Sequence, residues 1–265
     1  MSSEKSAAIV LRVTEFSETS CVVTLFTRDF GKITGLAKGA RRRKSPFESA
    51  LDVLSQIRVV FLHKNTEAMD LLTEAKLERR FRSAARNLDC LNCGYYVAEL
   101  LNSLTNNADP MPDVFDLAQR TLVELDENPA RPFVTLTRFE MELLHELGHS
   151  PMLNQCVACG DDVESMSRQY FSALMGGLIC STCRSGKTGV ITLSAEAWEL
   201  LDELACPAAK PEMSVAETAE PFGVETRNPA GLAEVRETLN LFVSHLLGKR
   251  PRLQAFLKLD GNRGN

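Results

Sequence analysis

Short apolar and β-branched segments alternate with polar turns over residues 7–80 and predict a run of strands. The clearest hairpin joins residues 20–27 to residues 32–38 through a turn that ends at Gly31. Several strands with irregular connections in so short a segment favour a small Greek-key barrel such as the OB-fold. A half-open five-stranded sheet packed on a helix is the alternative. The five strands are expected at residues 7–13, 20–27, 32–38, 51–63 and 69–77.

From residue 78 onward the apolar positions recur at the period of an amphipathic helix. Cys90 and Cys93 fall in this helical stretch and are expected to be buried thiols. Residues 206–230 are rich in Pro and Glu and contain few large apolar side chains, which predicts a long loop. The five expected helices span about residues 91–104, 114–125, 133–147, 194–205 and 232–247.

Four of the eight cysteines form a metal-ligand pattern, in which Cys156-x2-Cys159 and Cys180-x2-Cys183 are separated by 20 residues. Each pair can hold one side of a tetrahedral metal ion from a tight turn. Four thiolates leave no open coordination position, so the sequence predicts a structural Zn²⁺ site and no metal-based catalysis. Four free cysteines at a chance spacing are the alternative.

These patterns predict an α+β, multi-domain chain with an N-terminal five-stranded OB-fold barrel, followed by a helical domain with an embedded four-cysteine zinc module. The length of 265 residues also favours several subdomains over one. The expected divisions are the barrel in 1–80, the first part of the helical domain in 81–150, the zinc module in 151–190, the second part of the helical domain in 191–250 and a tail in 251–265.

Residues 145–149 match H-E-x-x-H, the signature of zinc proteases. The leucines of this predicted helix cluster on one face, which leaves His145 and His149 on roughly the opposite face. Pro151 follows two residues after His149 and ends the helix where a protease needs its last ligand held firmly. We therefore expect a solvated helix face, and a metallohydrolase is the least favoured alternative. In the same helix Glu140 projects onto the apolar face, which suggests a buried Arg as its partner.

Seven basic residues and one acid, Asp29, lie between positions 28 and 44. In OB-folds the loops and one face of the sheet form a nucleic-acid groove, and an Arg/Lys loop can neutralise phosphates without reading bases. A solvated turn that only aids solubility is the alternative. A second basic cluster at residues 76–86 is expected to share a helix face in part, and could extend the DNA track, hold an acidic peptide or be solvated. The predicted DNA-binding residues are Arg28, Lys32, Lys38, Arg41, Arg42, Arg43 and Lys44.

Charge is unevenly distributed along the chain. Residues 1–90 hold 16 Lys and Arg against 11 Asp and Glu, whereas residues 91–265 hold 14 against 24. We therefore expect only the first part to meet a polyanion, with random charge drift between subdomains as the alternative. The sequence has no apolar run long enough to cross a bilayer, and its start lacks the layout of a signal peptide. A cytoplasmic protein without a membrane partner is expected.

Residues 8–45 resemble the start of the RecO family of bacterial recombination mediators. Residues 96–100 resemble the Y-x-x-E-L helix of that family, and residues 138–151 resemble its R-F-E-x-x-L-L-x-x-x-G-x-x-P segment. The likeness covers most of residues 8–200, and the combination is specific although each piece alone is not. The zinc module of the family is matched by Cys156, Cys159, Gly160, Phe171, Ser172, Gly176, Gly177, Cys180 and Cys183.

The resemblance implies a non-catalytic mediator of recombinational repair that binds single- and double-stranded DNA and anneals complementary strands. It also implies that the protein works with RecR in loading RecA onto DNA coated by single-strand-binding protein, whose acidic C-terminal tail it would capture. Such a protein acts in the bacterial cytoplasm, at the nucleoid during repair. A zinc-ribbon transcription or translation factor is the alternative, because the same cysteines would suit it. The resemblance carries a DNA-binding role to Lys38, Arg41, Arg42, Arg43 and Lys44.

Overall fold

The computed structural model describes residues 2–42, 44–47, 50–63, 69–83, 87–163, 168–205 and 229–257. The chain divides into two compact units, each of which is described by itself. The first unit comprises Met1–Leu136 and Pro251–Leu257, and the second comprises Thr137–Arg250 and Lys258–Asn265. Most of the predicted loop at 206–230 lies outside the described residues, and its last two residues begin helix α5.

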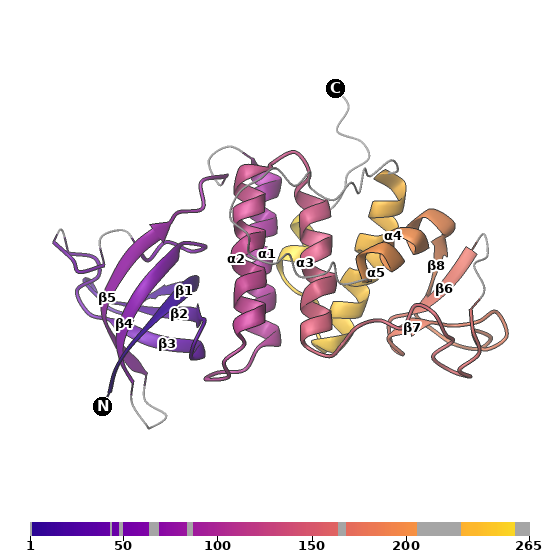
Figure 1. Ribbon diagram of the computed structural model, residues 1–265, viewed down its shortest axis with the longest axis horizontal. Coiled ribbons are helices and arrows are strands. Elements are labelled where there is room, and N and C mark those ends of the chain that lie inside the picture. Colours follow the sequence, from indigo (N-terminus) through magenta and orange to yellow (C-terminus); the bar gives the residue numbers. More distant parts are fainter. Residues whose placement is uncertain are drawn as a thin grey trace, which may run out of the picture. The chain divides into compact units, whose positions relative to one another are not determined.

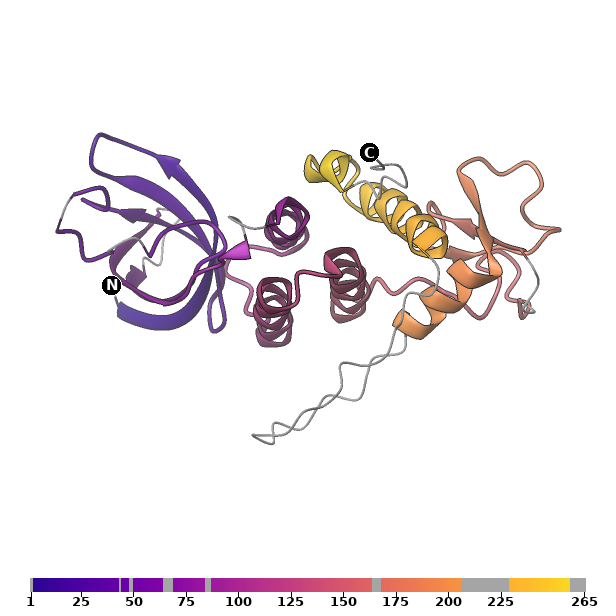
Figure 2. The same ribbon diagram turned by 90° about the horizontal axis from the view of Figure 1, so that it is seen from above.

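Five strands in the first unit form a closed barrel in the order β1-β2-β3-β5-β4 (Figure 1). Closure comes from antiparallel pairing of β1 with β4, and β3 pairs with β5 in parallel. Seen from above, the strands curl into a rounded outline (Figure 2). The predicted five-stranded barrel is therefore confirmed, and the half-open sheet is excluded. The strands are β1 (Ser2–Glu15), β2 (Cys21–Thr27), β3 (Gly31–Ala37), β4 (Gln56–His63) and β5 (Asp70–Arg79).

The barrel core comes from alternate positions of the strands, as the sequence pattern predicts. Val23 and Leu25 of β2 are fully buried. Val22, which precedes Val23, and Thr24, which lies between the two, are only partly buried. Phe61 of β4 is also fully buried within the same cluster. This alternation directs one face of each strand to the barrel interior and leaves the other face available for contacts outside it.

Two predicted boundaries in the barrel are wrong. The fourth strand begins at Gln56, because the segment before it forms turns in which buried Leu54 adopts a φ of 70°. The helical period does not begin at residue 78, because β5 continues to Arg79, which pairs with Gln56. Helix α1 (Leu88–Leu104) starts only after Asn87, whose side chain accepts hydrogen bonds from two N–H groups of its first turn.

Helices α1 and α2 (Pro112–Glu127) and the start of α3 (Pro132–Glu146) complete the first unit, together with the short 3₁₀-helix η2 (Leu253–Phe256). The carboxylate of Glu99 in α1 accepts hydrogen bonds from the backbone N–H groups of Arg252, at 2.7 Å, and Leu253, at 2.9 Å. The predicted tail therefore contains a segment that is fixed against α1.

The second unit combines a small sheet with helices α4 (Ala195–Ala205) and α5 (Pro229–Leu246), and its sheet has the order β7-β6-β8. Ser194 caps α4 as predicted, since its Oγ accepts a hydrogen bond from the N–H of Ala197 at 3.2 Å. The partner of Glu140 is Arg236 of α5, and both side chains are buried. The strands are β6 (Arg168–Ser172), β7 (Gly177–Leu178) and β8 (Val190–Ser194).

Candidate nucleic-acid interface and metal centre

The basic loop between β3 and β4 is exposed and tied to the barrel through its backbone. The N–H of Arg41 donates to the carbonyl of Thr19 at 3.1 Å, and the N–H of Gly39 donates to Oγ of Ser20 at 3.3 Å. Gly39 has a φ of 71°, in the left-handed region that glycine adopts without strain. These contacts anchor the loop to the β1–β2 turn while its long side chains face solvent.

Four of the predicted DNA-binding side chains stand together on this loop. Lys38, Arg41, Arg42 and Lys44 are all exposed, and Arg43 lies outside the described residues. Arg41 forms an ion pair with Glu15 at 3.0 Å, but both side chains remain largely exposed, at 48% and 79%. Because an exposed pair of this kind contributes little, a stronger anion can displace Glu15.

Arg28 and Lys32 lie elsewhere, where β3 and its preceding turn meet the helices of the first unit. Arg28 makes a two-pronged ion pair with Asp116 of α2, with N–O distances of 2.9 and 2.8 Å. Lys32 is buried, and its Nζ donates to the carbonyls of Asn102 and Thr105 at 2.6 and 2.7 Å. Burial lowers the pKa of the Lys32 ammonium. The structure thus separates these two cations from the loop and engages them in internal contacts.

Sequence reasoning missed this role of Lys32, which is to cap the C-terminal carbonyls of α1 from the barrel. The neighbouring Gly31 makes the approach possible, because a Cβ there would lie 2.1 Å from the carbonyl oxygen of Asp109. The β-strand pattern alone assigns Lys32 to a hairpin and contains no signal for a helix that begins far along the chain.

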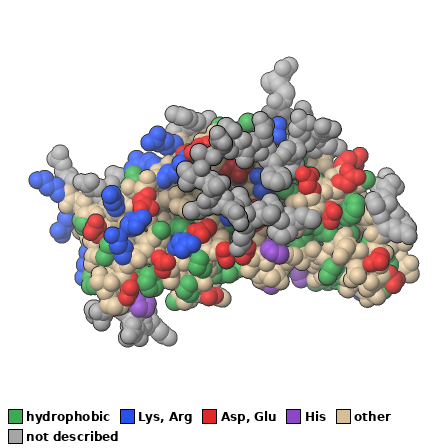
Figure 3. Space-filling view, viewed as in Figure 1, with side chains coloured by type: hydrophobic (Ala, Val, Ile, Leu, Met, Phe, Trp, Pro, Cys, Tyr) green, Lys and Arg blue, Asp and Glu red, His purple; other side chains and the backbone are tan. Residues whose placement is uncertain are grey.

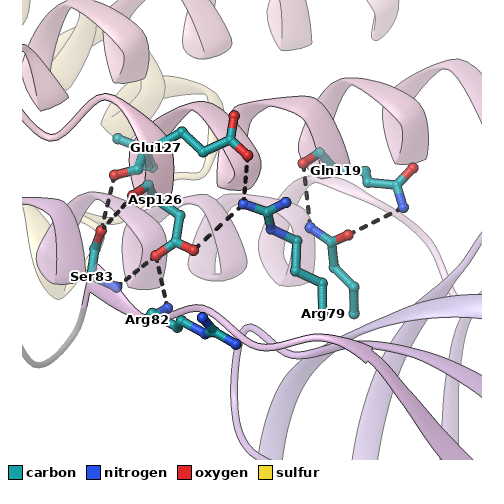
Figure 4. Close-up of polar contacts among 8 residues, drawn as sticks. Arg79, Arg82, Ser83, Gln119, Asp126 and Glu127 are labelled. Carbon is teal, nitrogen blue, oxygen red and sulfur yellow. Dashed lines mark hydrogen bonds and ion pairs between the residues drawn. The ribbon is translucent and has the colours of Figure 1, made fainter.

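The second basic cluster does not share a helix face as expected, since Lys76 and Arg79 lie on β5 and Arg80 and Arg82 follow it. Figure 4 shows Arg79 bridging the carboxylates at the end of α2, at 3.6 Å from Asp126 and 3.0 Å from Glu127. Arg80 also forms an ion pair, with Asp52 at 3.5 Å. An open groove of about 670 Å³ is lined by Leu77, Glu78, Arg79, Arg80, Arg82 and Asp126.

Positive side chains gather over the barrel on the face drawn in Figure 3. The strands of the barrel lie at the left of that view, where blue side chains are more frequent than red ones. This distribution agrees with the excess of Lys and Arg over Asp and Glu in the first 90 residues.

The four predicted metal ligands converge in the second unit. The Sγ atoms of Cys156, Cys159, Cys180 and Cys183 all lie within 4.8 Å of one another, and Cys159 and Cys180 are 3.9 Å apart. Tetrahedral Zn²⁺ with Zn–S bonds of about 2.3 Å would place its sulfurs about 3.8 Å apart. The arrangement therefore has the size and donor set of a four-thiolate metal site.

Backbone N–H groups point at the sulfurs, as metal-binding turns require. The N–H of Cys180 donates to Sγ of Cys156 at 3.3 Å, and that of Cys183 donates to Sγ of Cys180 at 3.4 Å. Burial raises the pKa of the Cys156 thiol, but hydrogen bonds from the backbone outweigh this effect and lower the pKa to about 6. Four thiolates held this closely repel one another, so a bound cation would stabilise the cluster.

The H-E-x-x-H segment does not form a metal site. Helix α3 ends at Glu146, and His149 follows Gly148, whose φ is 73°. His145, Glu146 and His149 are all exposed. Across the described ranges, the four cysteines are the only group of His, Cys, Asp or Glu side chains placed to share a metal ion.

Cys90 and Cys93 agree with the expectation of buried thiols. Cys90 and Cys93 are fully buried in α1, and Cys21 is buried in β2. Cys206 lies outside the described residues. Within the part of the chain that the structure covers, no helix combines the length and apolar character needed to cross a bilayer.

Comparison with known proteins agrees with this architecture. The family described as "Recombination protein O N terminal" matches residues 1–81, and "Recombination protein O C terminal" matches residues 85–254. The chain is 41% identical to the DNA repair protein RecO of Rhodopirellula baltica, over 96% of this chain and 99% of that protein. It is 32% identical to the DNA repair protein RecO of Anaeromyxobacter dehalogenans strain 2CP-C, over 96% and 95% of the two chains. The chain belongs to the RecO family of DNA repair proteins.

Proposed function

We propose that the protein is a non-catalytic mediator of recombinational repair that binds single- and double-stranded DNA through the basic loop of its barrel. The observation that carries this proposal is the exposed group Lys38, Arg41, Arg42 and Lys44, set beside the β1–β2 turn. Such a loop suits the phosphate backbone, which is the sequence-independent part of nucleic-acid recognition. Arg43 belongs to the same loop in sequence and is included in the proposal.

Arg28 and Lys32 are left out of the proposed DNA surface. Lys32 is buried and its ammonium already donates to two carbonyls, so contact with a phosphate would break the packing of α1 on the barrel. Arg28 is matched by Asp116. We infer instead that both residues position the barrel relative to α1 and α2.

The activity proposed from the family is annealing of complementary strands and, together with RecR, loading of RecA onto single-stranded DNA coated by single-strand-binding protein. Capture of the acidic C-terminal tail of that coat protein belongs to the same proposal. A protein with these roles acts in the bacterial cytoplasm, at the nucleoid. A zinc-ribbon transcription or translation factor is not favoured, since family membership supports DNA repair.

The four-cysteine cluster is proposed to hold structural Zn²⁺ through Cys156, Cys159, Cys180 and Cys183. Zn²⁺ would supply a cross-link between two turns, and its four thiolate ligands would leave no position for a substrate. The backbone N–H of Cys180 donates to Sγ of Cys156 and stabilises the ionised form of that thiol.

Strand annealing by purified protein tests the proposal. The triple variant Arg41→Ala/Arg42→Ala/Arg43→Ala should anneal two complementary oligonucleotides at least tenfold more slowly than the original protein. Lys249→Ala/Arg250→Ala/Arg252→Ala removes three positive charges and is the matched control, which should anneal at the original rate. Unchanged annealing in the loop variant would remove the proposed role of the loop. A pull-down with the acidic tail peptide separates the mediator from a zinc-ribbon factor, which should not retain the peptide.

A further inference from the structure

A polar cleft of about 490 Å³ opens beside the second cysteine pair, in the second unit. Two basic residues, Arg184 and Lys187, follow the ligand Cys183 and line this cleft. The aromatic ring of Tyr170 in β6 forms another part of its wall. Side-chain hydroxyl groups from Ser181, Ser185 and Thr192 complete the polar lining.

Backbone hydrogen bonds of the cysteine turn fix the main chain at these two basic residues. The N–H of Arg184 donates to the carbonyl of Cys180 at 3.1 Å, and the N–H of Lys187 donates to the carbonyl of Arg184 at 3.0 Å. Gly186 lies between them with a φ of 74°, and a Cβ added there would meet no atom within 4 Å. The chain therefore uses the left-handed conformation of Gly186 to complete a tight turn that continues the metal-binding loop.

The charges of the cleft are available to a ligand. Arg184 lies over the ring of Tyr170, with its Cζ 3.9 Å from the ring centroid, and remains exposed. Lys187 is also exposed. Among the described residues, neither Arg184 nor Lys187 forms an ion pair, whereas Arg28 and Arg79 are paired with carboxylates. The sequence of the second unit is acidic overall, so this pair of cations differs in charge from most of its surroundings.

We propose that this cleft binds a backbone phosphate of nucleic acid, so that the metal module supplies a second nucleic-acid contact besides the basic loop. Two cations and several hydroxyl donors suit the oxygens of a phosphate. The guanidinium stacked on Tyr170 adds a flat cationic surface on which an unpaired base can stack, a feature that a carboxylate-rich peptide would not use. The inference rests on the proposed function, because it assumes that the protein binds DNA.

Fluorescence anisotropy with labelled oligothymidylate and the full-length, metal-loaded chain tests the inference. Arg184→Ala/Lys187→Ala should lower the affinity at least tenfold at about 0.1 M salt and reduce the salt slope by about 0.7, which is the contribution of one phosphate contact on a single strand. Lys249→Ala/Arg250→Ala is the matched control, because it removes two exposed positive charges from the same unit, and it should leave both quantities unchanged. Metal content is measured for each variant.

A second variant controls for the possibility that the double substitution misfolds the cysteine turn. Lys187→Glu changes an exposed side chain and should retain the metal while weakening oligothymidylate binding. If both cleft variants retain full affinity and slope while the loop variant loses them, the cleft inference is wrong and the proposed function stands. If the original protein does not bind oligothymidylate, the cleft inference and the proposed function are both wrong. Binding of a poly-aspartate peptide that depends on Arg184 and Lys187, with unchanged oligothymidylate binding, would also overturn the assignment to nucleic acid.

Discussion

Glu140 of α3 and Arg236 of α5 form an ion pair whose side chains are only 0% and 3% exposed. The carboxylate projects from the apolar face of α3, whose Met141 and Leu144 belong to the core of the second unit. A buried charge is tolerated only when a partner and hydrogen bonds compensate for its lost hydration. The pair therefore fixes how α3 and α5 pack.

Removal of one partner should destabilise the protein strongly. Arg236→Met leaves the carboxylate buried without its cation and should lower the free energy of unfolding by about 3–5 kcal/mol. Thermal and urea unfolding followed by circular dichroism measure this change. The double variant Glu140→Met/Arg236→Met should recover much of the loss, because it removes both charges.

The exposed pair Arg58–Glu78 is the control for this experiment, with side chains 50% and 34% exposed. Arg58→Met should cost less than about 1 kcal/mol, since water already solvates both groups. Equal losses for Arg58→Met and Arg236→Met would contradict the interpretation of the buried pair.

Lys32 should prove structural and Lys38 functional, although both are basic and lie on or beside β3. Lys32→Met removes two hydrogen bonds to α1 and should lower the free energy of unfolding by about 1–3 kcal/mol. Below its unfolding temperature, the Lys32→Met variant should bind DNA with an affinity within about twofold of that of the original protein, a difference of about 0.4 kcal/mol. Lys38→Met should show the reverse, with normal stability and weaker DNA binding. A Lys32 variant that is fully stable and binds DNA poorly would contradict the assignment.

The protein should contain one metal ion per chain, and this ion should stabilise only the folded second unit. Cys156→Ser is expected to lose the metal, because three thiolates and one hydroxyl bind Zn²⁺ more weakly than four thiolates. Cys93→Ala, which changes a buried thiol in α1, should retain it. Atomic emission spectroscopy gives the metal content of each variant, and anisotropy gives its DNA binding. Purified protein that contains no metal and unfolds at the same temperature with and without added Zn²⁺ would argue against the site.

Several features that follow from a pattern along one segment are predicted correctly from the sequence. The alternation in β2 and β4 predicts the barrel, the cysteine spacing predicts the cluster, and the helical projection places His145 toward solvent and Glu140 toward the core. In each case a local period decides which side of an element faces the interior.

Contacts between segments that are distant in the chain could not be predicted from the sequence. The carbonyls that Lys32 caps lie 70 and 73 residues away, and Asp116 lies 88 residues from Arg28. The sequence pattern of hydrophobic and polar residues around a basic residue in a hairpin is the same whether its side chain faces solvent or a helix. The end of β5 was missed for a related reason, since Arg79 belongs to the strand through its pairing with Gln56 on β4.

The salt dependence of oligothymidylate binding tests the central claim most directly, namely that the basic loop grips the DNA backbone. Arg41→Ala/Arg42→Ala should reduce the slope of log affinity against log salt by about 1.4, the contribution of two phosphate contacts on a single strand. The control Lys249→Ala/Arg250→Ala should have the original slope. A loop variant with the original slope and affinity would show that Arg41 and Arg42 do not contact the strand, and the account of the barrel as the DNA-binding unit would be contradicted.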